Sequence, residues 1–159
     1  MTTASDKVEK RKHIIDPSAW ISGVSYFIGA VIAGGDHMLG TVSASRAAII
    51  AIPLSYLAFI ALVVLIQRQM HKSLRATTFG TPQQLVTSGI FAFSRHPIYA
   101  AFFMPLAALA TLSYAAAAIG MVTYIILMEI FVIRPEEAEL AQIFSADFAG
   151  WKAKTRKWF

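Results

Sequence analysis

The 159-residue sequence contains no cysteine and few charged residues, which make up 14% of the chain. The first absence excludes disulfide bonds, cysteine-ligated zinc and a cysteine nucleophile. The second, together with 57% hydrophobic residues, departs from soluble domains, in which about a quarter of the residues are charged. The chain also lacks the Gly-rich fingerprint of dinucleotide-binding proteins. A membrane protein is therefore predicted, and any chemistry must use groups other than thiols.

Positive charges outnumber negative ones, with a net charge of +5. Such an excess can indicate nucleic-acid binding. Here, however, the basic residues lie in short segments between apolar runs and form no nucleic-acid motif. Anionic membrane lipids are the expected counterpart, and no nucleic-acid partner is predicted.

Apolar runs predict four transmembrane helices in a single membrane domain, residues 1–159, at about 19–35, 47–66, 98–112 and 115–133. The second run has 20 residues, enough to cross roughly 30 Å of hydrocarbon. The last two spans form a hairpin. For the first run, a cleaved signal peptide is the alternative. The predicted fold class is an all-α integral membrane bundle.

The distribution of Lys and Arg predicts the orientation of this bundle. Segments 1–17, 67–97 and 134–159 together hold 13 of the 14 basic residues, and only Arg46 falls elsewhere. The positive-inside rule places these segments, and so both termini, in the cytoplasm. The Ala-rich composition favours a bacterial inner membrane.

The segment 134–159 is predicted to form an interfacial amphipathic helix with a basic aromatic tail. Its apolar residues recur at helical spacing, namely Leu140, Phe144, Phe148 and Trp151. Such a helix lies on the cytoplasmic surface of the membrane rather than across it.

Two weaker patterns concern packing and metals. Small residues at four-residue spacing permit close helix contacts within the bundle or between protomers of a homo-oligomer; they include Ala30/Gly34 and Ala116/Gly120. The pair Asp36–His37 lacks a third ligand, so no metal site is predicted.

Polar residues that could carry chemistry form two clusters, 94–99 before the third span and 134–137 after the fourth. Because the two spans form a hairpin, the clusters should meet at one membrane face. Pro97 suits a first helical turn, whose free N–H groups beside Arg95 could bind a carboxylate or phosphate. The paired glutamates of the second cluster could accept hydrogen bonds from ribose hydroxyls or an ammonium group.

The stretch LVTSGIFAFSRHPIY, residues 85–99, resembles the signature of the isoprenylcysteine carboxyl methyltransferase family and its phospholipid methyltransferase relatives. Glu136–Glu137, followed by Leu140, Phe144 and an aromatic tail, resembles the C-terminal motif of that family. The resemblance covers roughly residues 75–157, in the same order around the same hairpin.

The resemblance implies an integral membrane enzyme that takes a methyl group from S-adenosylmethionine and delivers it to a lipophilic acceptor. That acceptor would be a small molecule, lipid or lipidated substrate that enters from the bilayer. The residues that would bind the cofactor are Arg95, His96, Pro97, Tyr99, Glu136 and Glu137.

The sequence departs from the family pattern at four positions. Ala101 and Ser145 stand where the family usually has glycine, and Phe148 and Trp151 stand where tyrosine is common. These changes bear on the acceptor site and on membrane docking more than on cofactor binding.

Three residues are candidates for catalytic roles. Arg134 could orient a carboxylate acceptor, whereas His96 or Glu129 could remove a proton from an amine or hydroxyl acceptor. Structural roles compete with these hypotheses: Arg95 and Arg134 can be interfacial anchors, and Glu129 can be the partner of an arginine on a neighbouring helix.

Two other functions remain as alternatives. One is a membrane NAD(P)H-dependent reductase of the sterol-reductase type, because some of these enzymes look similar around the His-Pro-x-Tyr hairpin. The other is a noncatalytic membrane scaffold or carrier that has retained the fold.

Overall fold

The computed structural model describes residues 17–40, 46–73 and 85–158, without the side chains of 70–73. Except for its last residue, the predicted cytoplasmic segment 1–17 lies outside the described residues. The described chain is mostly helical and contains no β-strand. Its elements are α2 (Pro17–Met38), α3 (Arg46–Ser73), η2 (Gly89–Ala92), α4 (Pro97–Ala101), α5 (Phe103–Ala108), η3 (Leu109–Thr111), α6 (Tyr114–Met128), the π-helical η4 (Glu129–Ile133) and α7 (Arg134–Lys154).

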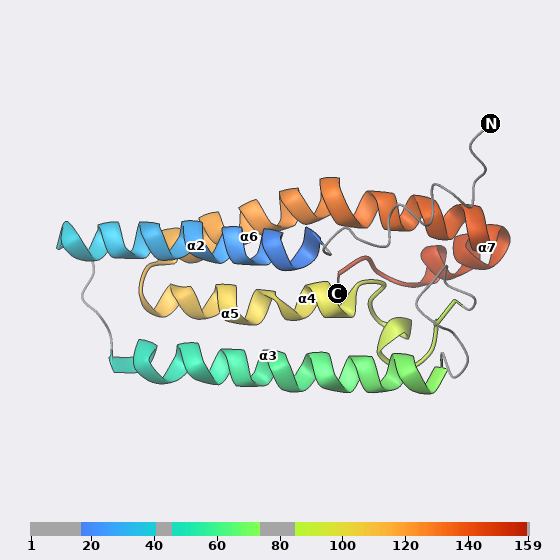
Figure 1. The fold of residues 1–159 in the computed structure, drawn as a ribbon, viewed down its shortest axis with the longest axis horizontal. Coiled ribbons are helices and arrows are strands. Elements are labelled where there is room, and N and C mark those ends of the chain that lie inside the picture. Colours follow the sequence, from blue (N-terminus) through green and yellow to red (C-terminus); the bar gives the residue numbers. More distant parts are fainter. Residues whose placement is uncertain (1–16, 41–45, 74–84, 159) are drawn as a thin grey trace.

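Three of the described helical stretches are long and apolar enough to cross a membrane: Pro17–Met38, Arg46–Gln69 and the continuous stretch Tyr114–Lys154. A fourth, Pro97–Thr111, is apolar but shorter. These four stretches run side by side with alternating directions (Figure 1). The all-α membrane bundle is thus confirmed, while the predicted boundaries of its four crossings stay a prediction.

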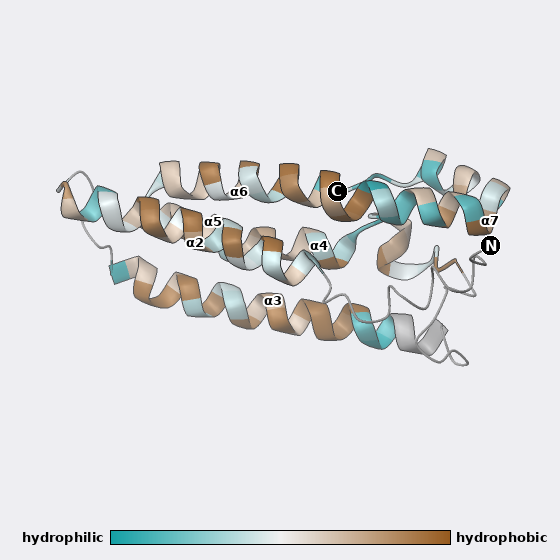
Figure 2. Ribbon diagram, turned by 45° about the horizontal axis from the view of Figure 1, so that its top comes forward, coloured by the Kyte–Doolittle hydropathy of each residue, from teal (hydrophilic) through white to brown (hydrophobic). Residues whose placement is uncertain are grey.

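Apolar residues dominate the long helices of the bundle, and hydrophilic residues are most frequent at the end that carries α7, here called the polar end (Figure 2). Large side chains of α3 are more than half exposed, as expected where lipid replaces water; they include Ile49, Leu54, Leu57 and Ile60. The interior holds one hydrophobic cluster made of Ile21, Leu106, Leu109, Ala117, Tyr124, Met128, Val132 and Ile133. The polar end contains α7 and the segment before α4.

Helices α2 and α6 pack closely because small residues face each other. Ser25 and Gly29 of α2 are buried, and a Cβ added to Gly120 would lie 3.3 Å from the Ser25 carbonyl oxygen. Ala116 also contributes, since its carbonyl oxygen lies 3.1 Å from a Cβ built on Gly29. The close face of α2 therefore differs from the predicted Ala30/Gly34 pair, and Gly34 has no atom within 4 Å of such a Cβ.

Helix α6 continues into α7 through the π-helical turn Glu129–Ile133. Pro135 explains this turn, because proline lacks the N–H that would bond the carbonyl four residues earlier and its ring would clash there. A π-turn accommodates the mismatch without ending the helix, and such turns are frequent at functional sites.

The segment 134–159 forms the predicted C-terminal helix, α7, followed by a tail, but the helix is bent. Ser145 interrupts α7 with φ 39° and ψ −106°, and the chain bends there. Beyond α7 the chain turns back along the bundle, so that Trp158 contacts Phe103 of α5 (Figure 1). The bend directs the basic tail toward the site described below.

Candidate functional site

The two polar clusters meet at one end of the bundle, between α4 and the start of α7. The Arg95 Nε donates to Glu137 Oε1 at 2.9 Å, across 42 positions of sequence. Their side chains are only 7% and 9% exposed. Because a buried unpaired charge is costly, the pairing leaves neither charge buried alone.

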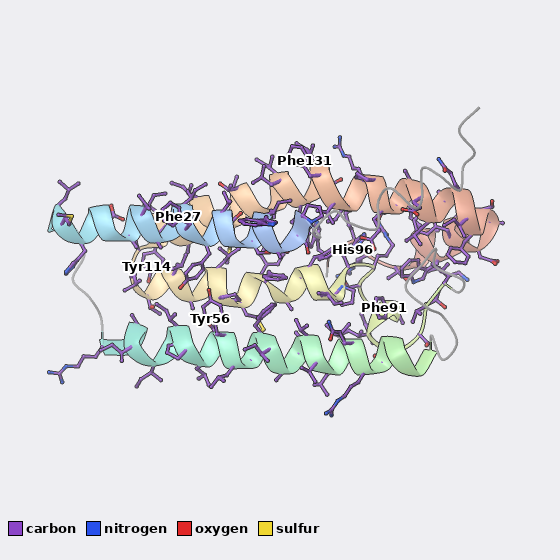
Figure 3. The ribbon with its side chains drawn as sticks, viewed as in Figure 1. Phe27, Tyr56, Phe91, His96, Tyr114 and Phe131 are labelled. Carbon is purple, nitrogen blue, oxygen red and sulfur yellow. The ribbon has the colours of Figure 1, made fainter. Side chains whose placement is uncertain are left out.

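His96 lies between the two adjacent glutamates. Its Nε2 is 3.3 Å from Glu137 Oε1 and its Nδ1 is 3.6 Å from Glu136 Oε2. The imidazole stacks on the Tyr99 ring, with centroids 5.6 Å apart (Figure 3 shows the position of His96). Burial lowers the pKa of His96, and this effect outweighs the hydrogen bond with Glu137, which raises it. The imidazole is therefore neutral at neutral pH and can accept a proton.

Glu137 is the most strongly bound carboxylate in the described part of the site. Its Oε1 contacts Arg95 and His96, and its Oε2 accepts from Lys152 Nζ at 2.7 Å. Burial alone would raise the pKa of Glu137, but the hydrogen bonds from Lys152 and Arg95 lower it to about 2. The group is therefore ionised at any physiological pH.

Glu136 is more accessible than its neighbour. Its side chain is 42% exposed, against 9% for Glu137. Glu136 therefore keeps part of its carboxylate accessible to a ligand at the surface of the site, while its Oε2, which faces the imidazole of His96, is buried.

Pro97 and Tyr99 shape the backbone of the site. Pro97 is buried in the first turn of α4, with His96 as the N-cap residue. The Tyr99 carbonyl accepts a hydrogen bond from Tyr124 Oη at 2.8 Å, and Tyr124 is fully buried in α6. This bond fixes α4, and so the stacked ring of Tyr99, against the adjacent helix.

Gly89 and Trp151 hold the segment before α4 in place. Gly89 has φ 63°, a conformation that favours glycine, and a Cβ there would lie 1.5 Å from Gln69 Nε2 and displace that amide. The same Gln69 amide donates to the Ser88 carbonyl at 3.0 Å, which ties the segment to α3. From the other side, Trp151 Nε1 donates to the Phe91 carbonyl at 3.0 Å.

Glu129 and Arg134 form a second group of charges. Glu129 Oε1 lies 3.3 Å from Arg134 Nε and 2.8 Å from Lys157 Nζ. The Arg134 side chain is 72% exposed. The basic partners of Glu129 thus come from its own continuous helix and from the tail, rather than from an arginine of a neighbouring helix.

Several residues at the site had not been singled out from the sequence: Lys152, Thr155, Lys157 and Trp158. Thr155 is 6% exposed, and its carbonyl accepts from Arg95 Nη1. Basic and aromatic residues near a membrane helix are equally typical of a segment that docks at the membrane interface. The sequence therefore did not predict that these residues would lie at the site.

Asp36 lies away from this site, at the opposite end of α2, where it accepts a hydrogen bond from Ser113 Oγ at the start of α6. Within the described ranges, no three potential metal-binding side chains gather. Through its hydrogen bond with Ser113, Asp36 supports the N-cap residue of α6.

The model of the isoprenylcysteine carboxyl methyltransferase family matches residues 47–142, more than half of the chain. The chain belongs to this family. The matched range includes both polar clusters, whereas Ser145 and the tail lie beyond it. Comparisons with curated proteins and with solved structures gave no match. Family membership and the apolar helices make this chain an integral, multi-pass membrane protein of a methyltransferase family.

Proposed function

We propose that this family member transfers a methyl group from S-adenosylmethionine to a lipophilic acceptor at the cytoplasmic membrane face. The observation that carries the proposal is the meeting of Arg95–His96 with Glu136–Glu137, across 41 and 42 positions, within the family-matched range. Methyltransferases of this family generally use this cofactor, and the proposal extends that use to this chain.

The chemistry of these side chains fits the cofactor. Arg95 provides a guanidinium suited to a carboxylate. Glu136 and Glu137 provide acceptors for an ammonium group and for ribose hydroxyls. The cofactor, when bound, supplies a methyl group activated by a positive sulfur. The task of the protein is then to hold donor and acceptor aligned and to exclude water, without a covalent enzyme intermediate.

His96 is the best supported of the three catalytic candidates. Its buried neutral imidazole could accept a proton from an amine or hydroxyl acceptor. For a carboxylate acceptor no base is needed, and the exposed Arg134 could orient it. Glu129 is engaged by Arg134 and Lys157, so we assign it a positioning role.

The acceptor is proposed to reach the site from the bilayer, with its polar group at the end of the bundle that carries the site. Membrane lipids would surround the apolar outer faces of α2, α3 and α6. Both termini would lie in the cytoplasm of a bacterium, on the side that supplies the cofactor.

The test is calorimetric titration of the detergent-purified protein with S-adenosylhomocysteine, with NADPH in parallel. Glu136→Gln is the informative variant, because Glu136 is accessible and its loss leaves the buried Arg95–Glu137 pair intact. Glu139→Gln, an exposed change on the same helix, is the matched control. We expect saturable binding that weakens about tenfold in Glu136→Gln and stays unchanged in Glu139→Gln.

Each other outcome has a defined meaning. Binding of NADPH alone would favour a membrane reductase, and binding of neither compound would favour a noncatalytic carrier. If S-adenosylhomocysteine binds, incubation with labelled S-adenosylmethionine and extracted membrane lipids will identify the class of acceptor.

A further inference from the structure

The segment Lys152–Trp158, here called the tail segment, occupies groups that the proposed function assigns to the cofactor. Lys152 Nζ contacts Glu137 Oε2 at 2.7 Å. Arg95 Nη1 donates to the carbonyls of Lys152, at 3.2 Å, and of Thr155. The guanidinium and the carboxylate of one buried pair are thus both engaged by the tail segment.

The backbone of the tail segment runs parallel to the residues before α4. The Arg95 N–H donates to the Arg156 carbonyl at 2.9 Å, and Ser94 Oγ donates to the Lys157 carbonyl at 3.4 Å. Ser94 and Arg156 form a parallel β-bridge. These bonds place the tail segment directly against the first polar cluster.

The far end of the tail segment is held by a second ion pair and by ring contacts. Lys157 Nζ lies 2.8 Å from Glu129 Oε1. The Trp158 ring lies 5.5 Å from Phe103 and 6.5 Å from Tyr124, centroid to centroid. The tail segment therefore contacts both groups of charges at the site.

We propose that the tail segment is an internal ligand that competes with the cofactor and must be released for the cofactor to bind. The inference rests on the proposed function, since it takes the cofactor as the competitor. Lys152 presents an ammonium to Glu137, as the amino group of the cofactor would, and two tail carbonyls already accept from the Arg95 Nη1 group that a cofactor carboxylate would use.

The exposure of the two lysines makes this release feasible. The Lys152 and Lys157 side chains are 48% and 32% exposed, whereas Glu137 is 9% exposed. Ion pairs whose cation reaches water are individually weak. A ligand that brings its own ammonium and carboxylate can therefore replace both contacts without leaving the buried Arg95–Glu137 pair unsatisfied.

The first experiment locks the tail segment in place. The protein has no cysteine, so in a Ser94→Cys/Arg156→Cys variant each new thiol has only the other as a partner within the chain, and the monomeric oxidised fraction is the one that is measured. Residues paired across a bridge lie about 5 Å apart, which is within disulfide range. We expect the oxidised variant to bind S-adenosylhomocysteine about tenfold more weakly than the same variant after reduction. Equal or tighter binding by the oxidised form would overturn the proposal.

The second experiment follows opening through a buried position of the tail segment. Thr155 is 6% exposed, so the labelling rate of Thr155→Cys by a thiol reagent reports the open population. Adding Lys152→Met, which removes the ammonium but keeps an apolar stem, should speed labelling about fivefold. The matched change Lys154→Met, at an exposed position, should not alter the rate. Equal rates with and without Lys152→Met would refute the role of this pair.

Addition of S-adenosylhomocysteine distinguishes release of the tail segment from closure of the tail segment over the compound. Faster labelling of Thr155→Cys on addition supports competition, and slower labelling means that the tail segment closes over the ligand, which overturns it. If no form of the protein binds the compound, the proposed function fails. The labelling rate of the Lys152→Met variant then decides alone whether the lysine holds the tail segment closed.

Discussion

The bend in α7 leads to a sharp prediction about Ser145. Its φ of 39° and ψ of −106° are close to the first central position of a type II′ turn, where glycine is strongly preferred. It is the one non-glycine residue with positive φ in the described part of the chain. Glycine adopts such angles without the steric cost of a Cβ, so Ser145→Gly should relieve local strain.

The expected gain follows from two opposing terms. A side chain held in such a sparsely populated conformation costs about 1–3 kcal/mol. Glycine offsets about 0.5–1 kcal/mol of the gain from relieved strain, because it gives the unfolded chain more conformational entropy to lose on folding. The serine is exposed, so its removal sacrifices little packing. The net stabilisation should be about 1 kcal/mol, or a rise in Tm of about 2–4 °C.

The assay is thermal unfolding in detergent, followed by circular dichroism. Two variants serve as controls. Ser145→Ala keeps a Cβ and should give no gain, and Ala146→Gly, at the next and helical position, should lose about 1 kcal/mol. A Tm for Ser145→Gly at or below that of the parent protein would refute the reasoning and show that the bend does not depend on a strained serine.

Three further predictions concern the core and the site. Gly29→Ala should destabilise the protein by about 1–2 kcal/mol in detergent unfolding, because the new Cβ would lie 2.6 Å from the buried Leu109 Cδ1. Tyr124→Phe removes the hydrogen bond to the Tyr99 carbonyl and should cost about 1 kcal/mol in the same assay. Stability should also fall as pH decreases through about 6.5, because unfolded chains then bind a proton at His96 that the buried imidazole, with its lowered pKa, resists. Melting curves across this pH range should show a shallower dependence in His96→Gln.

Each of these predictions has a contrasting variant or an outcome that would contradict it. Gly34→Ala meets nothing within 4 Å and should be neutral or slightly stabilising, so a loss equal to that of Gly29→Ala would contradict the packing argument. Tyr114 is exposed, and Tyr114→Phe should leave Tm unchanged. An unaltered pH dependence in His96→Gln would mean that another group titrates in that window.

Much of the architecture could be predicted because it depends on local patterns. Hydropathy over about 20 residues identifies a membrane helix without knowledge of its neighbours. The hairpin of the last two apolar segments was enough to predict that Arg95–His96 and Glu136–Glu137 would meet, and the structure brings them together. The family itself was identified from the same two motifs and is confirmed.

The choice of contact faces could not be predicted in the same way. Ala30/Gly34 and Ser25/Gly29 are equally plausible close-packing faces by spacing, and only the position of α6 selects the second. Likewise, the sequence alone shows an acidic residue, Glu129, inside a span but not which cation neutralises it.

The sequence by itself thus determined the helical membrane character, the two polar motifs and their meeting at one end, because hydrophobicity and hairpin connectivity act along the chain. Only the tertiary structure decided that the tail returns to the site. That outcome depends on the backbone angles of Ser145, which turn the chain and allow Lys152 and Lys157 to reach Glu137 and Glu129. Contacts of this kind join residues through space, and their partners follow from the bend rather than from spacing in the sequence.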